Sequence, residues 1–117
     1  MNIGLCSGRH DMKTNCGNEM DYYLFQSPVE DPTNVDVHEK VCREFIKNHI
    51  TGDLSWKRSS DRRVSVYITG LTPLLTSFLK VWVENQERLE MTCGDLVLWH
   101  WDSKDGQYLP QKWAMIT

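Results

Sequence analysis

Two short segments of the chain carry side chains and backbone groups of the kinds that bind anions. The first consists of Ser7, Gly8, Arg9 and His10, with Lys13 shortly after it. A guanidinium can hold a phosphate through two parallel hydrogen bonds, and an imidazole can donate to phosphate or exchange a proton with a reacting group. This segment suits a phosphate-bearing ligand, although the same residues also fit an ordinary solvated loop.

The second segment consists of Thr69, Gly70, Leu71, Thr72 and Pro73, between a β-branched run and an apolar run. Gly70 allows close backbone approach, and the threonine hydroxyls can bond a phosphate oxygen. A helix that begins here would offer its N-terminal N–H groups to an anion. The alternative is that Gly70 only makes a turn and Thr72 only caps the helix. The chain contains neither a P-loop signature nor a GxGxxG dinucleotide fingerprint.

His100 and Trp101 complete the predicted ligand-binding set. They end the apolar run 96–101, in which strand alternation puts Leu96, Leu98 and His100 on one face and Val97, Trp99 and Trp101 on the other. His100 either packs as a core histidine or reaches a ligand at the end of the strand. Indole and phenol rings can stack on a nucleobase, which makes candidates of Trp99, Trp101, Trp113, Tyr22 and Tyr23, but such rings also form cores and subunit contacts.

A catalytic set is not evident in the sequence. No Ser-His-Asp or Cys-His arrangement stands out, and nothing marks Cys6 as reactive. The four cysteines have no CxxC spacing, so we expect free thiols, no metal site and no cofactor. His38 and His49 fall on a predicted helix, where we expect them at the surface. If the protein is an enzyme, Arg9 and His10 are the candidate catalytic residues.

The elements that position these segments follow from hydropathy patterns. Strands are predicted at residues 1–7, 21–26, 64–69, 96–101 and 107–114, with Pro110 confining the last strand to a sheet edge. One helix is predicted at 35–49, with Asn34 as its N-cap and an apolar face of Val37, Val41, Phe45 and Ile46. A second is predicted at 73–85, with Thr72 as its N-cap and Pro73 as its first residue.

The order β-β-α-β-α-β-β predicts one Rossmann-like α/β domain over residues 1–117, with a mixed, mostly parallel sheet and two main helices. The unit from residue 64 to residue 101 should form a parallel strand pair with a right-handed crossover. Ligands of such sheets bind beyond the carboxyl ends of the parallel strands. If the strands at 1–7 and 64–69 are neighbours, both anion-binding segments open on one edge.

Charge and hydropathy exclude several classes of partner. The net charge is −3, and the Lys and Arg residues are scattered, which argues against binding of duplex nucleic acid. No apolar run is long enough for a transmembrane helix, and the N-terminus lacks the basic region of a secretory signal. We therefore expect no membrane association and a cytoplasmic protein.

The strand, the Thr-Gly-Leu-Thr-Pro loop (residues 69–73) and the helix that follows resemble the nucleotide-sensing Rossmann-like domains of CRISPR systems, called CARF domains. Ser7 to His10 match that layout more loosely. The resemblance implies a short Gly/Thr loop against the phosphates of a cyclic oligonucleotide, usually in a dimer. A single domain of this size is also similar to small phage proteins that sequester or cleave immune signalling nucleotides, which would place it in a host cytoplasm.

Three functions remain open. The first is a non-enzymatic protein that binds and sequesters a small anionic nucleotide-type ligand, such as a cyclic nucleotide or cyclic ADP-ribose, as a homodimer or higher oligomer; it would act as a viral anti-defence sponge. The second is a ring-nuclease-like phosphodiesterase that cleaves such a ligand with Arg9 and His10. The third is a protein–protein interaction module anchored by Trp56, Trp82 and Trp113. We favour the first.

Overall fold

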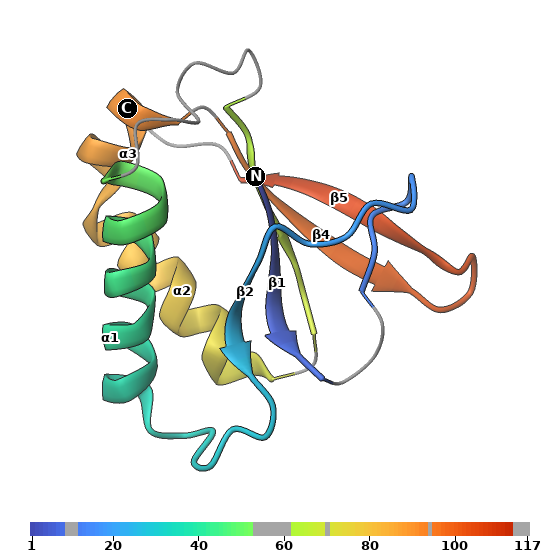
Figure 1. The fold of residues 1–117 in the computed structure, drawn as a ribbon, viewed down its shortest axis with the longest axis horizontal. Coiled ribbons are helices and arrows are strands. Elements are labelled where there is room, and N and C mark those ends of the chain that lie inside the picture. The colour runs from blue at the N-terminus through green and yellow to red at the C-terminus, as the bar shows by residue number, and fades with distance from the viewer. Residues whose placement is uncertain (9–11, 53–61, 70, 94, 114–117) are drawn as a thin grey trace.

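Five strands form a single sheet in the order β2-β1-β3-β4-β5 in the computed structural model (Figure 1). The strands are β1 (Asn2–Ser7), β2 (Tyr22–Gln26), β3 (Val64–Tyr67), β4 (Leu96–Asp102) and β5 (Gln107–Trp113). The first four are parallel, and β5 pairs antiparallel with β4. The structure describes residues 1–8, 12–52, 62–69, 71–93 and 95–113, without the side chains of residues 90–92. The predicted fold class, element order and parallel β3–β4 pair are confirmed.

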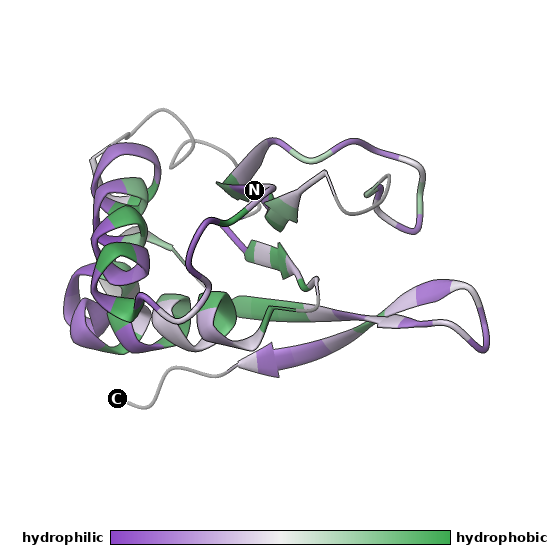
Figure 2. Cartoon of the chain, turned by 90° about the horizontal axis from the view of Figure 1, so that it is seen from below, coloured by the Kyte–Doolittle hydropathy of each residue, from purple (hydrophilic) through white to green (hydrophobic). Residues whose placement is uncertain are grey.

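The helices lie together on one face of this sheet (Figures 1 and 2). They are α1 (Val35–Phe45), the π-helix η1 (Ile46–Thr51), α2 (Thr72–Glu84) and α3 (Gln86–Thr92). Their apolar side chains form the main core with the strand residues that face them, including Ile3, Leu5, Val64, Val66, Leu96 and Leu98. None of the helices described is long and apolar enough to cross a lipid bilayer.

The buried face of α1 differs from the predicted one. Val37, expected in the core, is 52% exposed, whereas His38 is 4% exposed. The stripe that faces the sheet is His38, Cys42 and Phe45, at the i, i+4, i+7 spacing of a helix face. His38 can be buried because its Nε2 lies 2.9 Å from the Pro32 carbonyl oxygen and its ring meets that of Phe25 edge to face. Its predicted surface position is wrong.

His49 was also expected at the surface, but it is half-buried, with its ring 4.4 Å from that of Tyr22 and 4.8 Å from that of Phe45. It lies in η1, where the regular helix expected up to residue 49 has already ended at Phe45. Asn34 flanks α1 as predicted, but its side chain makes no capping hydrogen bond.

A charged network joins α1 to α2. Glu39 is a buried residue, and its carboxylate lies 2.8 Å from the Lys80 ammonium and 3.4 Å from the Arg43 guanidinium. Arg43 also pairs with Glu84 at 3.1 Å. The hydrogen bond from Lys80 is the main reason that the pKa of Glu39 lies below its usual value. The network explains how a carboxylate can lie in the contact between α1 and α2.

Two buried thiols should make the free energy of unfolding depend on pH in the alkaline range. Burial raises the pKa of Cys42 to about 12 and that of Cys93 to about 11, from a value of 9.0. As the pH rises, these thiols lose their protons in the unfolded chain at a lower pH than in the native protein. The stability that the protonated thiols contribute below about pH 9 is therefore lost progressively above it. Each thiol should remove about 1.4 kcal/mol of unfolding free energy per pH unit until its native pKa is reached.

Urea unfolding at several pH values between 8 and 10.5 measures this decline. The matched control is the double variant Cys42→Ala, Cys93→Ala, which is less stable at pH 8 but should show a clearly flatter dependence on pH. An unchanged slope in the double variant would contradict the assignment.

Residues 12–21, which precede the parallel strand β2, cross the face of the sheet opposite the helices (Figure 2); this segment is called the crossover. A second small core lies beneath this crossover. Met12 is 1% exposed there and packs with Tyr67 and Tyr108. The Tyr67 ring stacks on that of Trp99 at 5.5 Å and meets that of Tyr108 edge to face at 4.8 Å. The crossover thus covers the aromatic centre of the helix-free face.

The crossover also reaches the outer edge of β5. The Asn15 side-chain amide donates to the Tyr108 carbonyl and accepts from the Tyr108 N–H, both at 2.9 Å. These groups point away from β4. Pro110 lies two residues further along β5, so its backbone nitrogen, which carries no hydrogen, also faces outward. The edge position predicted from Pro110 is confirmed, and this edge offers few groups for pairing with a further strand.

Candidate functional site

The two predicted anion-binding segments begin at the same edge of the sheet. β1 and β3 are adjacent and parallel, with Gly4 opposite Tyr67, so their carboxyl ends lie side by side (Figure 1). Ser7 ends β1 and Gly8 follows it. Thr69 lies two residues beyond Tyr67, the last residue of β3. The neighbour relationship expected from the sequence is confirmed. Arg9, His10 and Gly70 lie outside the described residues, and the binding roles of both segments stay predictions.

Gly8 makes the turn out of β1. Its φ of +79° is in the left-handed region, and a Cβ added there would lie 3.1 Å from the Cβ of Ser27. A larger residue would therefore be strained by backbone conformation and crowded by its neighbour. Ser7, half-buried, is the last residue of β1. The chain at this point passes close to the end of β2, at the same edge.

Thr69 has the most informative environment at this edge. The residue is 4% exposed, and its Oγ1 is buried without a hydrogen-bond partner. Its carbonyl accepts from the Leu71 N–H at 2.7 Å, which closes a tight turn before α2. A buried hydroxyl without a partner costs about 1–3 kcal/mol, and such a group calls for an explanation such as a bound water or ligand.

The first turn of α2 has no side-chain cap. We predicted Thr72 as the N-cap and Pro73 as the first helical residue, but Leu71 flanks the helix, Thr72 is its first residue and Pro73 its second. Leu71 takes the flanking position because its backbone is extended, with φ −96° and ψ 97°. The predicted cap is therefore wrong by one position. An apolar Leu71 side chain cannot accept from the N–H groups of the turn.

The first turn of α2 offers few backbone N–H donors, and it contains no acidic side chain that would neutralise the partial positive charge of the helix N-terminus. Pro73 has no N–H, and the Leu74 N–H donates to the Leu71 carbonyl at 3.1 Å. That leaves the Thr72 N–H, beside the exposed Thr72 hydroxyl, as the donor that the turn can offer. No acidic side chain lies in the first turn of α2. The partial positive charge of the helix N-terminus is therefore available to an anion.

His100 does not occupy the core position that was one of its two predicted environments. It is exposed, and its Nε2 lies 2.8 Å from the Gln111 side-chain oxygen of β5. The core position considered for it is wrong because β4 and β5 extend beyond the helices, so this end of the strand has no helix over it (Figure 2). Its role in ligand binding stays a prediction.

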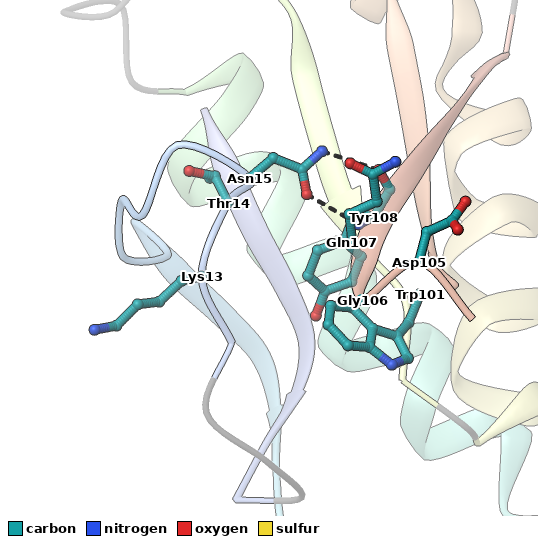
Figure 3. Close-up of a pocket in the computed structure, with 8 residues that line it drawn as sticks. All are labelled: Lys13, Thr14, Asn15, Trp101, Asp105, Gly106, Gln107 and Tyr108. Atoms are coloured by element: carbon teal, nitrogen blue, oxygen red, sulfur yellow. Dashed lines mark hydrogen bonds between the residues drawn. The ribbon is translucent and has the colours of Figure 1, made fainter. Parts of the chain in front are cut away.

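Lys13 and Trp101 both line an open depression of about 710 Å³ between the crossover and the β4–β5 hairpin (Figure 3). The other residues that line it are Thr14, Asn15, Asp105, Gly106, Gln107 and Tyr108. The Lys13 side chain extends away from the Trp101 indole in Figure 3. The two predicted residues therefore share the depression without converging on one point within it.

The aromatic rings expected to stack on a base differ sharply in exposure. Trp101 is 51% exposed, and its ring meets that of the buried Tyr108 edge to face at 5.1 Å. Trp99 is half-buried by its stack on Tyr67, and its Nε1 is buried without a hydrogen-bond partner. Sequence reasoning treated these rings alike because the alternation of a strand does not show where the crossover lies.

A second hollow of about 310 Å³ lies between the end of β2 and α1, lined by Phe25, Gln26, Val29, Glu30, Asp31, Asn34, Val37, His38 and Val41. Its two charged side chains, Glu30 and Asp31, are acidic, which makes it a poor place for an anion. Sequence reasoning missed this hollow because it depends on the burial of His38.

Comparisons of this chain with protein family models, with curated proteins and with solved structures find no match. The structure therefore supports a small Rossmann-like α/β domain without assigning it to a family.

Proposed function

We propose that this protein binds a small nucleotide-derived anion, with a phosphate of the ligand at the corner formed by Thr69 and the first turn of α2. The observation that carries the proposal is the buried Thr69 Oγ1, which has no hydrogen-bond partner beside an uncapped helix N-terminus. A phosphate oxygen that displaced the atoms covering this hydroxyl would accept from it and from the Thr72 N–H, and the helix dipole would favour its charge.

The position of the corner in the fold supports the same function. It lies beyond the carboxyl ends of the parallel strands β1 and β3, where open α/β sheets bind their ligands. The net charge of −3 gives no general attraction for a polyanion, so a compact ligand held by local donors is favoured over duplex nucleic acid.

Storage of the ligand is favoured over its cleavage. The described polar side chains of the two segments at this edge are the hydroxyls of Ser7, Thr69 and Thr72, which can hold a phosphate but are poor proton-transfer groups at neutral pH. The protein would then act as a sponge for a cyclic nucleotide or a cyclic ADP-ribose isomer, in a viral anti-defence role and as a homo-oligomer, as the resemblance to CARF domains and phage proteins implies.

Thermal unfolding in the presence of candidate ligands tests the proposal. The panel contains cyclic dinucleotides, cyclic oligoadenylates, cyclic ADP-ribose isomers and inorganic pyrophosphate. A ligand at a hundred times its Kd adds about 2.7 kcal/mol of stability, which raises the Tm of a domain of this size by about 10 °C. The proposal fails if no member of the panel stabilises the protein at high micromolar concentration.

Chromatography of the bound ligand after heat release separates storage from cleavage. Recovery of the intact cyclic compound supports a sponge. A linear product would instead support the ring-nuclease alternative, and substitution of Arg9 or His10 by alanine should then abolish its formation.

A further inference from the structure

We infer that Trp101 is the stacking platform for the nucleobase of the ligand whose phosphate lies at the Thr69 corner. The inference rests on the proposed function and assigns the nucleobase of the ligand to the depression shown in Figure 3.

Register places Trp101 at the same end of the sheet as the phosphate corner. Tyr67 of β3 lies opposite Trp99 of β4, and the Ile68 N–H still donates to the Trp99 carbonyl at 3.0 Å. Thr69 is two residues beyond Tyr67, and Trp101 is two residues beyond Trp99. Thr69 and Trp101 therefore both lie two residues beyond the last β3–β4 pair, at the same end of the sheet.

Trp101 has the exposure and the support that stacking requires. Half of the residue is open to solvent, in contrast to the buried Tyr67 and Tyr108. Its indole rests against Tyr108, whose ring rests against Tyr67, and the Tyr67 ring is stacked on that of Trp99. Asn15 fixes the Tyr108 backbone from the other side. A platform held in this way loses little conformational freedom when a planar ring is placed on it.

The rim of the depression is polar and includes Thr14, Asp105 and Gln107. These side chains include hydrogen-bond donors and acceptors, which suits the edge of a nucleobase better than that of a purely apolar ring. Trp113 lacks this setting because it lies at the far end of β5, opposite Leu96. It is therefore a matched control of the same residue type.

Calorimetric titration with base-bearing and base-free probes tests the inference. The base-bearing probes are cyclic di-AMP, cyclic tetra-adenylate and ADP-ribose, and the base-free probes are pyrophosphate and ribose 5-phosphate. Stacking on an aromatic side chain strengthens binding by about 5- to 150-fold per base. Trp101→Ala should lose this factor for the base-bearing probes only, Trp101→Phe should keep most of it, and Trp113→Ala should keep all of it.

The outcomes separate this inference from the proposal on which it rests. If the base-bearing probes bind Trp101→Ala as tightly as the unaltered protein, the stacking role of Trp101 is wrong and the phosphate corner stands. If no probe of either kind binds the unaltered protein, the proposed function and the inference both fail. Circular dichroism of each variant establishes that it is folded.

Discussion

Replacement of Trp82 by alanine should lower the free energy of unfolding by about 3–5 kcal/mol, which is a large part of the 5–15 kcal/mol typical of a single domain. Trp82 is 1% exposed and is among the largest fully buried side chains of the described core. It lies in α2, with its ring 5.7 Å from that of Phe78, between the helix layer and the sheet. Its removal leaves a cavity that rigid neighbours cannot fill.

Trp82→Phe should cost far less, within about 1.5 kcal/mol of the unaltered protein. The Trp82 Nε1 is buried without a hydrogen-bond partner. Phenylalanine removes this donor and recovers about 1–3 kcal/mol, which offsets the loss of part of the ring volume. Urea unfolding followed by circular dichroism measures both variants, with the more exposed Trp113→Phe as a control. Equal destabilisation by alanine and phenylalanine would show that the indole N–H is paired.

Thr69→Val should separate ligand binding from stability. Valine keeps the shape of threonine and removes the hydroxyl that has no partner, so the free protein should be as stable as before or more stable by about 1–3 kcal/mol. The hydrogen bond from that hydroxyl to a phosphate would be lost. A hydrogen bond to a charged group contributes about 1.5–3 kcal/mol, so the Kd should rise at least about 10-fold.

Thr76→Val is the matched control for this experiment. Thr76 is an exposed residue of α2, the helix that follows Thr69, and its hydroxyl donates to the carbonyls of Thr72 and Pro73. Calorimetry should show unchanged ligand affinity for Thr76→Val. A stable Thr69→Val protein that binds as tightly as the unaltered one would remove Thr69 from the site. Loss of stability in Thr69→Val would show that the hydroxyl already has a structural partner.

The fold followed from local patterns because β2, β3 and β4 are short runs of apolar, aromatic or β-branched residues ended by polar or turn-forming residues. The runs at 64–69 and 96–101 became β3 and β4 with shifts of one or two residues at their ends. The face of α1 could not be predicted in the same way. The burial of His38 depends on its hydrogen bond with the Pro32 carbonyl and on its contact with the Phe25 ring of β2. Neither can be inferred from the spacing of apolar residues. The short helix α3 was missed because it carries no such periodic signal.

The two segments of the candidate site could be predicted from the sequence, but the surroundings of their side chains could not. Topology brought Ser7 and Thr69 to one edge, as a parallel sheet requires. The burial of the Thr69 hydroxyl and the one-residue shift at the start of α2 depend on tertiary packing and on the extended conformation of Leu71. The contact between Asn15 and Tyr108 joins residues 93 positions apart, so the support of Trp101 was also beyond sequence reasoning.

The most direct measurement of the central claim is a map of backbone amide chemical shifts by nuclear magnetic resonance while a ligand from the panel is added. The claim predicts that the largest changes appear at Ser7, Gly8, Thr69, Leu71 and Thr72, together at the carboxyl edge of β1 and β3. Changes centred instead on the hollow between β2 and α1, at Val37 and His38, would contradict it, even if the ligand binds tightly.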